Sequence, residues 1–355
     1  MTDLNKKSAS RRFKSLTFIA CCFLLFTFCT EKKKNKNQIE LLSEIGFLSF
    51  ATTAYRCNIN SASNYNFFNS GDIPSGSSVT VKRINTVLKS AGTVEVYYPD
   101  TATKNLPVLA LYQGGNVNSS FYSNYAARLA ASDYVVYVAN RCTTFILQYF
   151  IYPDASLASE VYDLAKTQSI DSTSPLFGRL DAEKIGVLGH SLGGVVGLFS
   201  INGICDFPFC AWATTRLAQI KAGLFYGSGL GESFDKKRYY TDSSGKGIPS
   251  GYIQGSIDTA NTPDSSTKNF ANVISPKYLF AIEGLNHYGI TDVNNPFGAK
   301  SETNLSSFSQ TQTIDKIASV SIEFLNAYIK NDSASLSKIN SGNMGISGVT
   351  TTSSP

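Results

Sequence analysis

The hexapeptide Gly189-His190-Ser191-Leu192-Gly193-Gly194 restricts the fold more than any other part of this sequence. It contains the pattern G-x-S-x-G, and it lies between an apolar strand-like run, 184–188, and a helix-like run, 195–199. Such a turn forces the serine into a strained backbone conformation, and glycines two residues before and after it avoid a clash. The pattern predicts a strand–turn–helix that raises Ser191 above a sheet at a helix N-terminus. The alternative, a glycine-rich turn that only caps a helix, is less consistent with the flanking strand and helix signals.

A serine at such a turn acts as a nucleophile when an imidazole accepts its proton. The chain has two histidines. His190 lies inside the turn, where its side chain points away from the serine, and we expect it to be structural. His287 follows the strand-like run 278–282, which makes it the predicted general base. The alternative is a loop histidine without a catalytic role.

The third member of such a site is a carboxylate between the serine and the histidine in chain order. It holds the imidazole in one tautomer and stabilises the imidazolium. Asp258 follows the strand-like run 251–255 and a short turn, and it is the predicted acid. Asp264 is the alternative, and two earlier residues, Asp235 and Asp242, are more remote ones.

Two backbone N–H groups are expected to stabilise the negative oxygen that forms during acyl transfer. One is that of Leu192, directly after the serine. The second is assigned to Gly115, in the loop Gln113-Gly114-Gly115-Asn116 that follows the strand-like run 108–112. A glycine there lets the backbone approach a substrate carbonyl closely. The segment 227–231 is glycine-rich but lacks the spacing of a dinucleotide loop, and we expect it beside the active site.

Strand-like and helix-like segments alternate from residue 107 onward, after an antiparallel pair at 79–87 and 92–98. This order predicts an α/β protein with a mostly parallel central sheet and helices on both faces. The catalytic domain is assigned to residues 79–331. The polar, Ser/Thr/Gly-rich residues 332–355 are predicted to be disordered.

The N-terminal segment has the features of an export signal. Five basic residues precede an apolar run at 16–29, which is short for a membrane span. We therefore assign residues 1–29 to a signal peptide or lipoprotein signal, and 30–78 to a tether and irregular segment. Cysteines in or at the end of the run resemble the acylated residue of bacterial lipoproteins, and the candidates are Cys21, Cys22 and Cys29. These features predict a lipid-anchored protein of the cell envelope, with a secreted or periplasmic protein as the alternative.

Most of the net charge of +5 belongs to this N-terminal segment, so no nucleic-acid partner is expected. Four further cysteines, Cys57, Cys142, Cys205 and Cys210, can form disulfides in an exported protein. The closely spaced pair Cys205 and Cys210 predicts a short stapled loop. No histidine lies near these cysteines, so zinc is not expected, and the predicted chemistry needs neither metal nor organic cofactor.

The chain resembles the α/β-hydrolase superfamily, and within it the dienelactone hydrolase, chlorophyllase and bacterial cutinase (polyester hydrolase) group. The resemblance covers about residues 79–331 and rests on five segments: 96–99, 113–115, 127–136, 189–194 and 286–289. It implies an α/β-hydrolase fold and ester hydrolysis through an acyl-enzyme.

Carried over by position, the resemblance makes Ser191 the nucleophile, His287 the base and Asp258 the acid, with Gly115 and Leu192 as oxyanion donors. The implied substrate is a small-molecule, lipid or polymer ester. Many relatives have an aromatic residue where Gly115 stands, so their substrate preference does not transfer. The alternatives are an acyltransferase or thioesterase with the same triad, and a surface binding protein or adhesin lipoprotein on a hydrolase scaffold.

Overall fold

The computed structural model describes residues 70–73, 75–88, 92–145, 148–205, 209–210, 215–229 and 245–355. The predicted export signal, with its three cysteines, and most of the predicted tether lie outside this range. So do Cys57, Asp235 and Asp242. Within the described range, no helix combines the length and the apolar character needed to cross a membrane.

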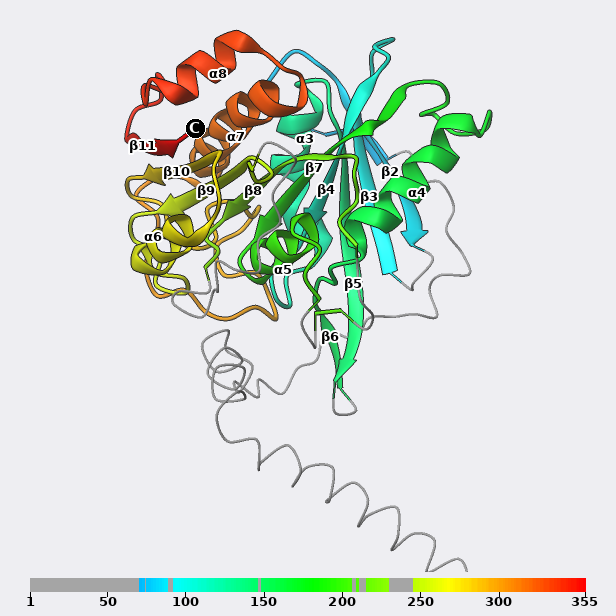
Figure 1. Cartoon of the computed structure of the whole chain (residues 1–355). Coiled ribbons are helices and arrows are strands. Elements are labelled where there is room, and N and C mark those ends of the chain that lie inside the picture. Colours follow the sequence, from blue (N-terminus) through cyan, green and yellow to red (C-terminus); the bar gives the residue numbers. More distant parts are fainter. Residues whose placement is uncertain are drawn as a thin grey trace, which may run out of the picture. The chain divides into compact units, whose positions relative to one another are not determined.

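The described strands form an 11-stranded sheet in the order β1-β2-β3-β5-β4-β7-β8-β9-β10-β11, with β6 paired to β5 (Figure 1). The strands are β1 (Ser70–Ile73), β2 (Val81–Leu88), β3 (Gly92–Pro99), β4 (Leu106–Tyr112), β5 (Val135–Phe145), β6 (Gln148–Ile151), β7 (Leu180–His190), β8 (Ile220–Tyr226), β9 (Ser250–Gly255), β10 (Lys277–Ile282) and β11 (Val349–Ser354). Strands β5, β4, β7, β8, β9 and β10 are mutually parallel. The predicted antiparallel pair is present as β2 and β3, in which Val81 is opposite Pro99.

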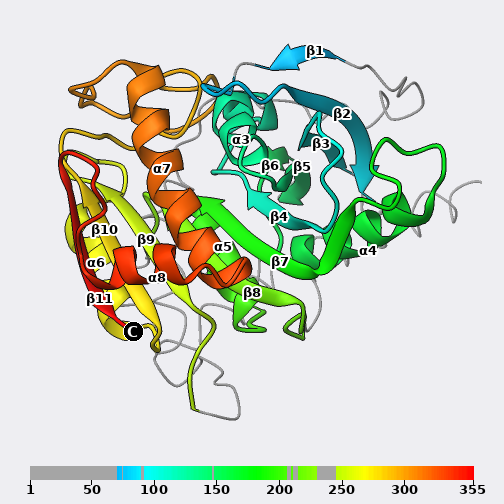
Figure 2. The same cartoon turned by 90° about the horizontal axis from the view of Figure 1, so that it is seen from above.

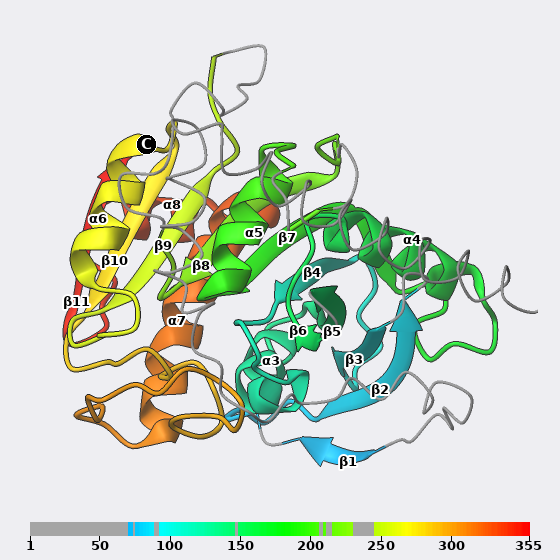
Figure 3. The same ribbon diagram turned by 90° about the horizontal axis from the view of Figure 1, so that it is seen from below.

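Helices pack on both faces of this sheet, as Figures 2 and 3 show. Helices α3 (Ser123–Ala130), α7 (Gln310–Ile329) and α8 (Ser333–Asn340) lie on one face. Helices α4 (Leu157–Ile170), α5 (Leu192–Ile201) and α6 (Pro263–Asn272) lie on the other. A short 3-10 helix, η2 (Ser119–Tyr122), precedes α3. The predicted fold class, an α/β-hydrolase fold with a mostly parallel sheet, is confirmed.

The central strands are apolar because both of their faces are covered. Every residue of β4 is buried, as expected for a parallel strand between two helix layers. Leu109 and Leu111 of β4 face the layer of α3 and α7, where they join one hydrophobic core with Phe324 of α7. This rigid centre fixes the carboxyl ends of the strands, at which an open α/β sheet binds its ligands.

The prediction of a disordered tail at 332–355 is wrong. Asp332 caps α8 by accepting hydrogen bonds from the N–H groups of Ala334 and Ser335, at 2.8 and 3.1 Å. Ile339 is buried in the core, and β11 extends the sheet antiparallel to β10. Ser- and Thr-rich composition suggested disorder, but threonine also favours strands and suits a half-exposed edge. The predicted irregular segment likewise ends in a short edge strand, β1.

Candidate active site

The G-x-S-x-G segment forms the predicted strand–turn–helix. Strand β7 ends at His190, helix α5 begins at Leu192, and Ser191 between them has φ 53° and ψ −123°. A positive φ is strained for serine, and the Ser191 N–H helps to hold the turn by donating to the Tyr226 carbonyl at 2.9 Å. A Cβ at Gly189 would lie 2.5 Å from the Gly193 carbonyl oxygen, so this position requires glycine.

His287 and Asp258 come together at the ends of neighbouring strands. Asp258 follows β9, His287 follows β10, and the His287 Nδ1 lies 2.8 Å from the Asp258 Oδ2. The side chains are 4% and 0% exposed, respectively. Because a carboxylate only accepts hydrogen bonds, Nδ1 carries the proton and Nε2 keeps a lone pair. The geometry brings together the two residues predicted as base and acid.

The alternative acid, Asp264, does not approach His287. It lies in the first turn of α6, its side chain is 73% exposed, and it pairs with Lys268 at 2.9 Å. In contrast, the second oxygen of Asp258 accepts the Asn261 N–H at 2.7 Å. Between the two aspartates, only Asp258 is held in a fixed, buried orientation against the imidazole.

The end of β8 passes directly against this His–Asp pair. Gly227 has a φ of 54°, and a Cβ there would lie 3.0 Å from the Asp258 Oδ2 and 3.1 Å from the His287 Nδ1. The expectation that this glycine-rich loop lies beside the site is correct for its first residues, and 230–231 lie outside the described residues. Glycine here permits both the backbone conformation and the close approach.

Glu302, which sequence reasoning missed, anchors the loop that carries Asp258. Its side chain accepts the N–H groups of Thr259 at 2.8 Å and Ala260 at 3.3 Å, as well as that of Asn304 at 2.9 Å. Burial alone would raise the pKa of Glu302, but hydrogen bonds from the Thr259 hydroxyl and these N–H groups lower it below its usual value. Glu302 lies 43 residues beyond Thr259 in a polar loop, and no local pattern marks it.

Gly115 and Leu192, the predicted oxyanion donors, lie close to one another. A Cβ at Gly115 would be 3.4 Å from the Leu192 Cδ2. Among the described residues, neither of their N–H groups donates a hydrogen bond. The N–H groups on either side of Gly115 do have acceptors. The Gly114 N–H donates to the Tyr122 hydroxyl at 2.8 Å, and the Asn116 N–H donates to the Ile151 carbonyl at 2.9 Å. The loop is thus held on both sides of the Gly115 N–H, which has no acceptor among the residues that the structure describes.

An aromatic side chain from another segment covers Gly115. The Tyr152 Cε1 lies 3.1 Å from the position of a Gly115 Cβ, and the Tyr152 side chain is nearly buried, at 9% exposed. Burial raises the pKa of Tyr152 to about 12, so its hydroxyl stays protonated at neutral pH. Tyr152 follows β6, and its N–H donates to the Arg141 carbonyl of β5 at 3.0 Å.

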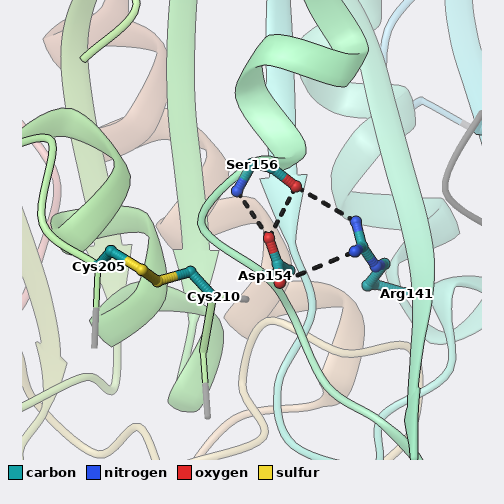
Figure 4. Close-up of a disulfide and its surroundings, with 5 residues drawn as sticks. All are labelled: Arg141, Asp154, Ser156, Cys205 and Cys210. Atoms are coloured by element: carbon teal, nitrogen blue, oxygen red, sulfur yellow. Dashed lines mark hydrogen bonds and ion pairs between the residues drawn. A yellow bond between two sulfur atoms is a disulfide. The ribbon is translucent and has the colours of Figure 1, made fainter. Parts of the chain in front are cut away.

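The segment after Tyr152 is also tied down (Figure 4). The Arg141 guanidinium lies 3.8 Å from the Asp154 carboxylate and donates to the Ser156 hydroxyl at 3.3 Å. The predicted stapled loop is present as the Cys205–Cys210 disulfide. It adjoins the same segment, because the Ala155 N–H donates to the Phe209 carbonyl at 2.9 Å. These contacts hold Tyr152 against the candidate oxyanion loop.

The sheet order, the two helix layers and the serine at a strand–helix turn define an α/β-hydrolase. Residues 72–221 match the PET hydrolase-like family (PETase). The matched segment runs from the end of β1 to the start of β8 and includes Gly115, Ser191 and Leu192. A comparison with curated proteins gives no match. Residues 72–221 are thus similar to the PET hydrolase-like family, and the fold of the described chain is that of an α/β-hydrolase. The predicted resemblance to the polyester-hydrolase group is confirmed.

Proposed function

We propose that this protein hydrolyses carboxylic esters through an acyl-enzyme, with Ser191 as nucleophile, His287 as general base and Asp258 as the acid that orients it. The observation that carries the proposal is the buried 2.8 Å hydrogen bond between the His287 Nδ1 and the Asp258 Oδ2. This contact leaves the His287 Nε2 as the proton acceptor that a serine nucleophile requires. The PET hydrolase-like family supports the same chemistry, because its name implies ester hydrolysis.

In this mechanism the His287 Nε2 accepts the proton of the Ser191 hydroxyl as its oxygen attacks the ester carbonyl. The oxyanion of the tetrahedral intermediate accepts hydrogen bonds from the N–H groups of Gly115 and Leu192. Asp258 stabilises the imidazolium, which then protonates the leaving alcohol. Water attacks the acyl-enzyme by the same route, with His287 again as base, and releases the carboxylic acid.

We propose a polyester, or a small ester that resembles one, as the substrate. The family match supports a polyester. Gly115 has no side chain, and the ring of Tyr152 lies beside it. The proposed export signal fits this substrate, because a polymer that cannot enter a cell has to be hydrolysed outside the cytoplasm.

A fluorophosphonate probe tests the proposal, since it reacts covalently with activated serines. We expect the parent protein to be labelled on Ser191 and to hydrolyse p-nitrophenyl acetate. The Ser191→Ala variant should fold normally, escape labelling and lose about three or more orders of magnitude in kcat, because the triad acts as a unit. Absence of labelling in a folded parent protein would overturn the proposal and favour a binding protein on a hydrolase scaffold.

A further inference from the structure

Three hydrogen bonds in series cross the core beneath the candidate site. The Gly114 N–H donates to the Tyr122 hydroxyl at 2.8 Å. The Tyr122 hydroxyl lies 2.9 Å from the His190 Nδ1, and the His190 Nε2 lies 3.0 Å from the His287 carbonyl oxygen. The series therefore joins the loop of Gly115 to the loop of His287, and one of its two inner members, His190, is the residue directly before Ser191.

The donors and acceptors fix the direction of every bond in this series. A carbonyl oxygen only accepts, so the His190 Nε2 carries the proton and its Nδ1 is the acceptor. The Tyr122 hydroxyl then donates to Nδ1 while its oxygen accepts the Gly114 N–H. Each polar group is satisfied while His190 is neutral.

The surroundings keep these groups dry and in place. Tyr122 and His190 are both 0% exposed. A Cβ at Gly114 would lie 2.9 Å from the His190 Nδ1, so the glycine loop packs against the imidazole edge. Burial, and secondarily the neighbouring His287, hold the pKa of His190 well below its usual value, and burial raises that of Tyr122. Hydrogen bonds in such an environment are strong, and a partner left unsatisfied is costly.

We infer that His190 is a positioning residue, which together with Tyr122 sets the distance between the oxyanion loop and the base loop. The inference rests on the proposed function. Tyr122 fixes the Gly114 amide next to Gly115, and His190 fixes the backbone of His287. The Gly115 N–H and the His287 imidazole therefore keep one geometry relative to Ser191. A displacement of about 1 Å between reacting groups lowers rates by about 10²-fold. The second histidine of the chain thus acts through its neighbours, without contacting the substrate.

Two tyrosines allow a matched test. Tyr122→Phe removes the hydroxyl at the centre of the series. Tyr125→Phe is the control, because Tyr125 lies on α3, is 2% exposed, and uses its hydroxyl in a single 2.8 Å hydrogen bond to Ser321 away from the site. We expect both variants to remain folded, with the larger loss of melting temperature in Tyr122→Phe, because its hydroxyl makes two hydrogen bonds in the series. Only Tyr122→Phe should lower kcat for p-nitrophenyl acetate, by about 10- to 100-fold with little change in KM.

Substitutions of His190 test the geometry of the series. A glutamine amide has an NH₂ donor group and a carbonyl acceptor about as far apart as the two imidazole nitrogens, so H190Q should retain most of kcat. H190F, which has neither group, should lose about as much as Tyr122→Phe. The double variant Tyr122→Phe/H190F should be little worse than the worse single variant, because both changes break the same series. Multiplicative losses would overturn a shared role.

Nuclear magnetic resonance provides a readout that does not depend on activity. With nitrogen-15 histidine, the full chain gives only four ring-nitrogen signals, two from each of its two histidines. We expect His190 as the Nε2–H tautomer, unchanged between about pH 5 and 8, with its Nδ1 signal shifted by Tyr122→Phe but not by Tyr125→Phe. An Nδ1–H tautomer would overturn the series. A parent protein that neither reacts with the fluorophosphonate probe nor hydrolyses the ester would overturn the proposed function. An active parent protein with equal kcat in the two tyrosine variants would overturn only this inference.

Discussion

Replacing Asp258 by asparagine tests the proposed acid with little disturbance of the fold. The Asp258 Oδ1 accepts the Asn261 N–H at 2.7 Å, and its Oδ2 lies 2.8 Å from the His287 Nδ1. In Asp258→Asn the amide oxygen keeps the bond from Asn261, so the amide NH₂ must face His287. A second donor there forces Nδ1 to become the acceptor and moves the imidazole proton to Nε2.

An imidazole protonated at Nε2 cannot accept the proton of Ser191. The same tautomer error lowers kcat about 10⁴-fold in a serine protease, which corresponds to about 5.4 kcal/mol of transition-state stabilisation. We therefore expect Asp258→Asn to reduce kcat for p-nitrophenyl butyrate by about 10⁴-fold, with KM nearly unchanged. Steady-state kinetics give the rate, and circular dichroism melting verifies the fold.

Asp264→Asn is the matched control. It removes an exposed ion pair to Lys268, which contributes little to stability, so kcat should fall by less than about tenfold. The reverse pattern would move the acid to Asp264. Near-normal rates in both variants would refute the reasoning from the His287 tautomer and leave the proposed triad without its third member.

Three further predictions concern other parts of the chain. Gly227→Ala should lower kcat by more than about tenfold, because its Cβ would press on the His–Asp pair, whereas Gly178→Ala, also at positive φ but with nothing within 4 Å, should only reduce stability; equal rates would refute this. Because the pKa of Glu302 is lowered in the folded protein, its ionised side chain stabilises the fold at pH values above its usual pKa of 4.5. This contribution to stability is lost as the pH falls through the lowered pKa. Acid titration monitored by fluorescence should show a steeper loss of stability in the parent than in Glu302→Gln. The mature protein should be membrane-associated, sensitive to globomycin and shortened by about 20–28 residues; an intact Met1 in mass spectrometry would contradict export.

Local sequence patterns were sufficient to predict the central part of the fold. The strand–turn–helix at Ser191 has a steric requirement that G-x-S-x-G meets, and the alternation of apolar segments predicted the parallel strands and their helices. The positions of Asp258 and His287 followed from strand ends and chain order. Their contact could be expected because β9 and β10, after which they occur, are neighbouring parallel strands.

Other features depend on contacts between segments far apart in the chain. Glu302 caps the Asp258 loop from a polar segment, and Tyr152 reaches Gly115 from the end of a strand hairpin. Neither has a local pattern, because its role depends on where the folded sheet places its partner. The C-terminal tail was missed for a related reason, since Ser- and Thr-rich composition does not show whether a neighbouring strand edge is available.

The central claim is that Ser191 forms an acyl-enzyme with His287 as base. Rapid acid quenching during turnover of a p-nitrophenyl ester, followed by peptide mass mapping, measures this intermediate directly. We predict one acyl group on the peptide that contains Ser191, no acyl group in the Ser191→Ala variant, and much slower acylation in His287→Ala. Turnover with no acyl group on this peptide, or with the acyl group on another residue, would contradict the account.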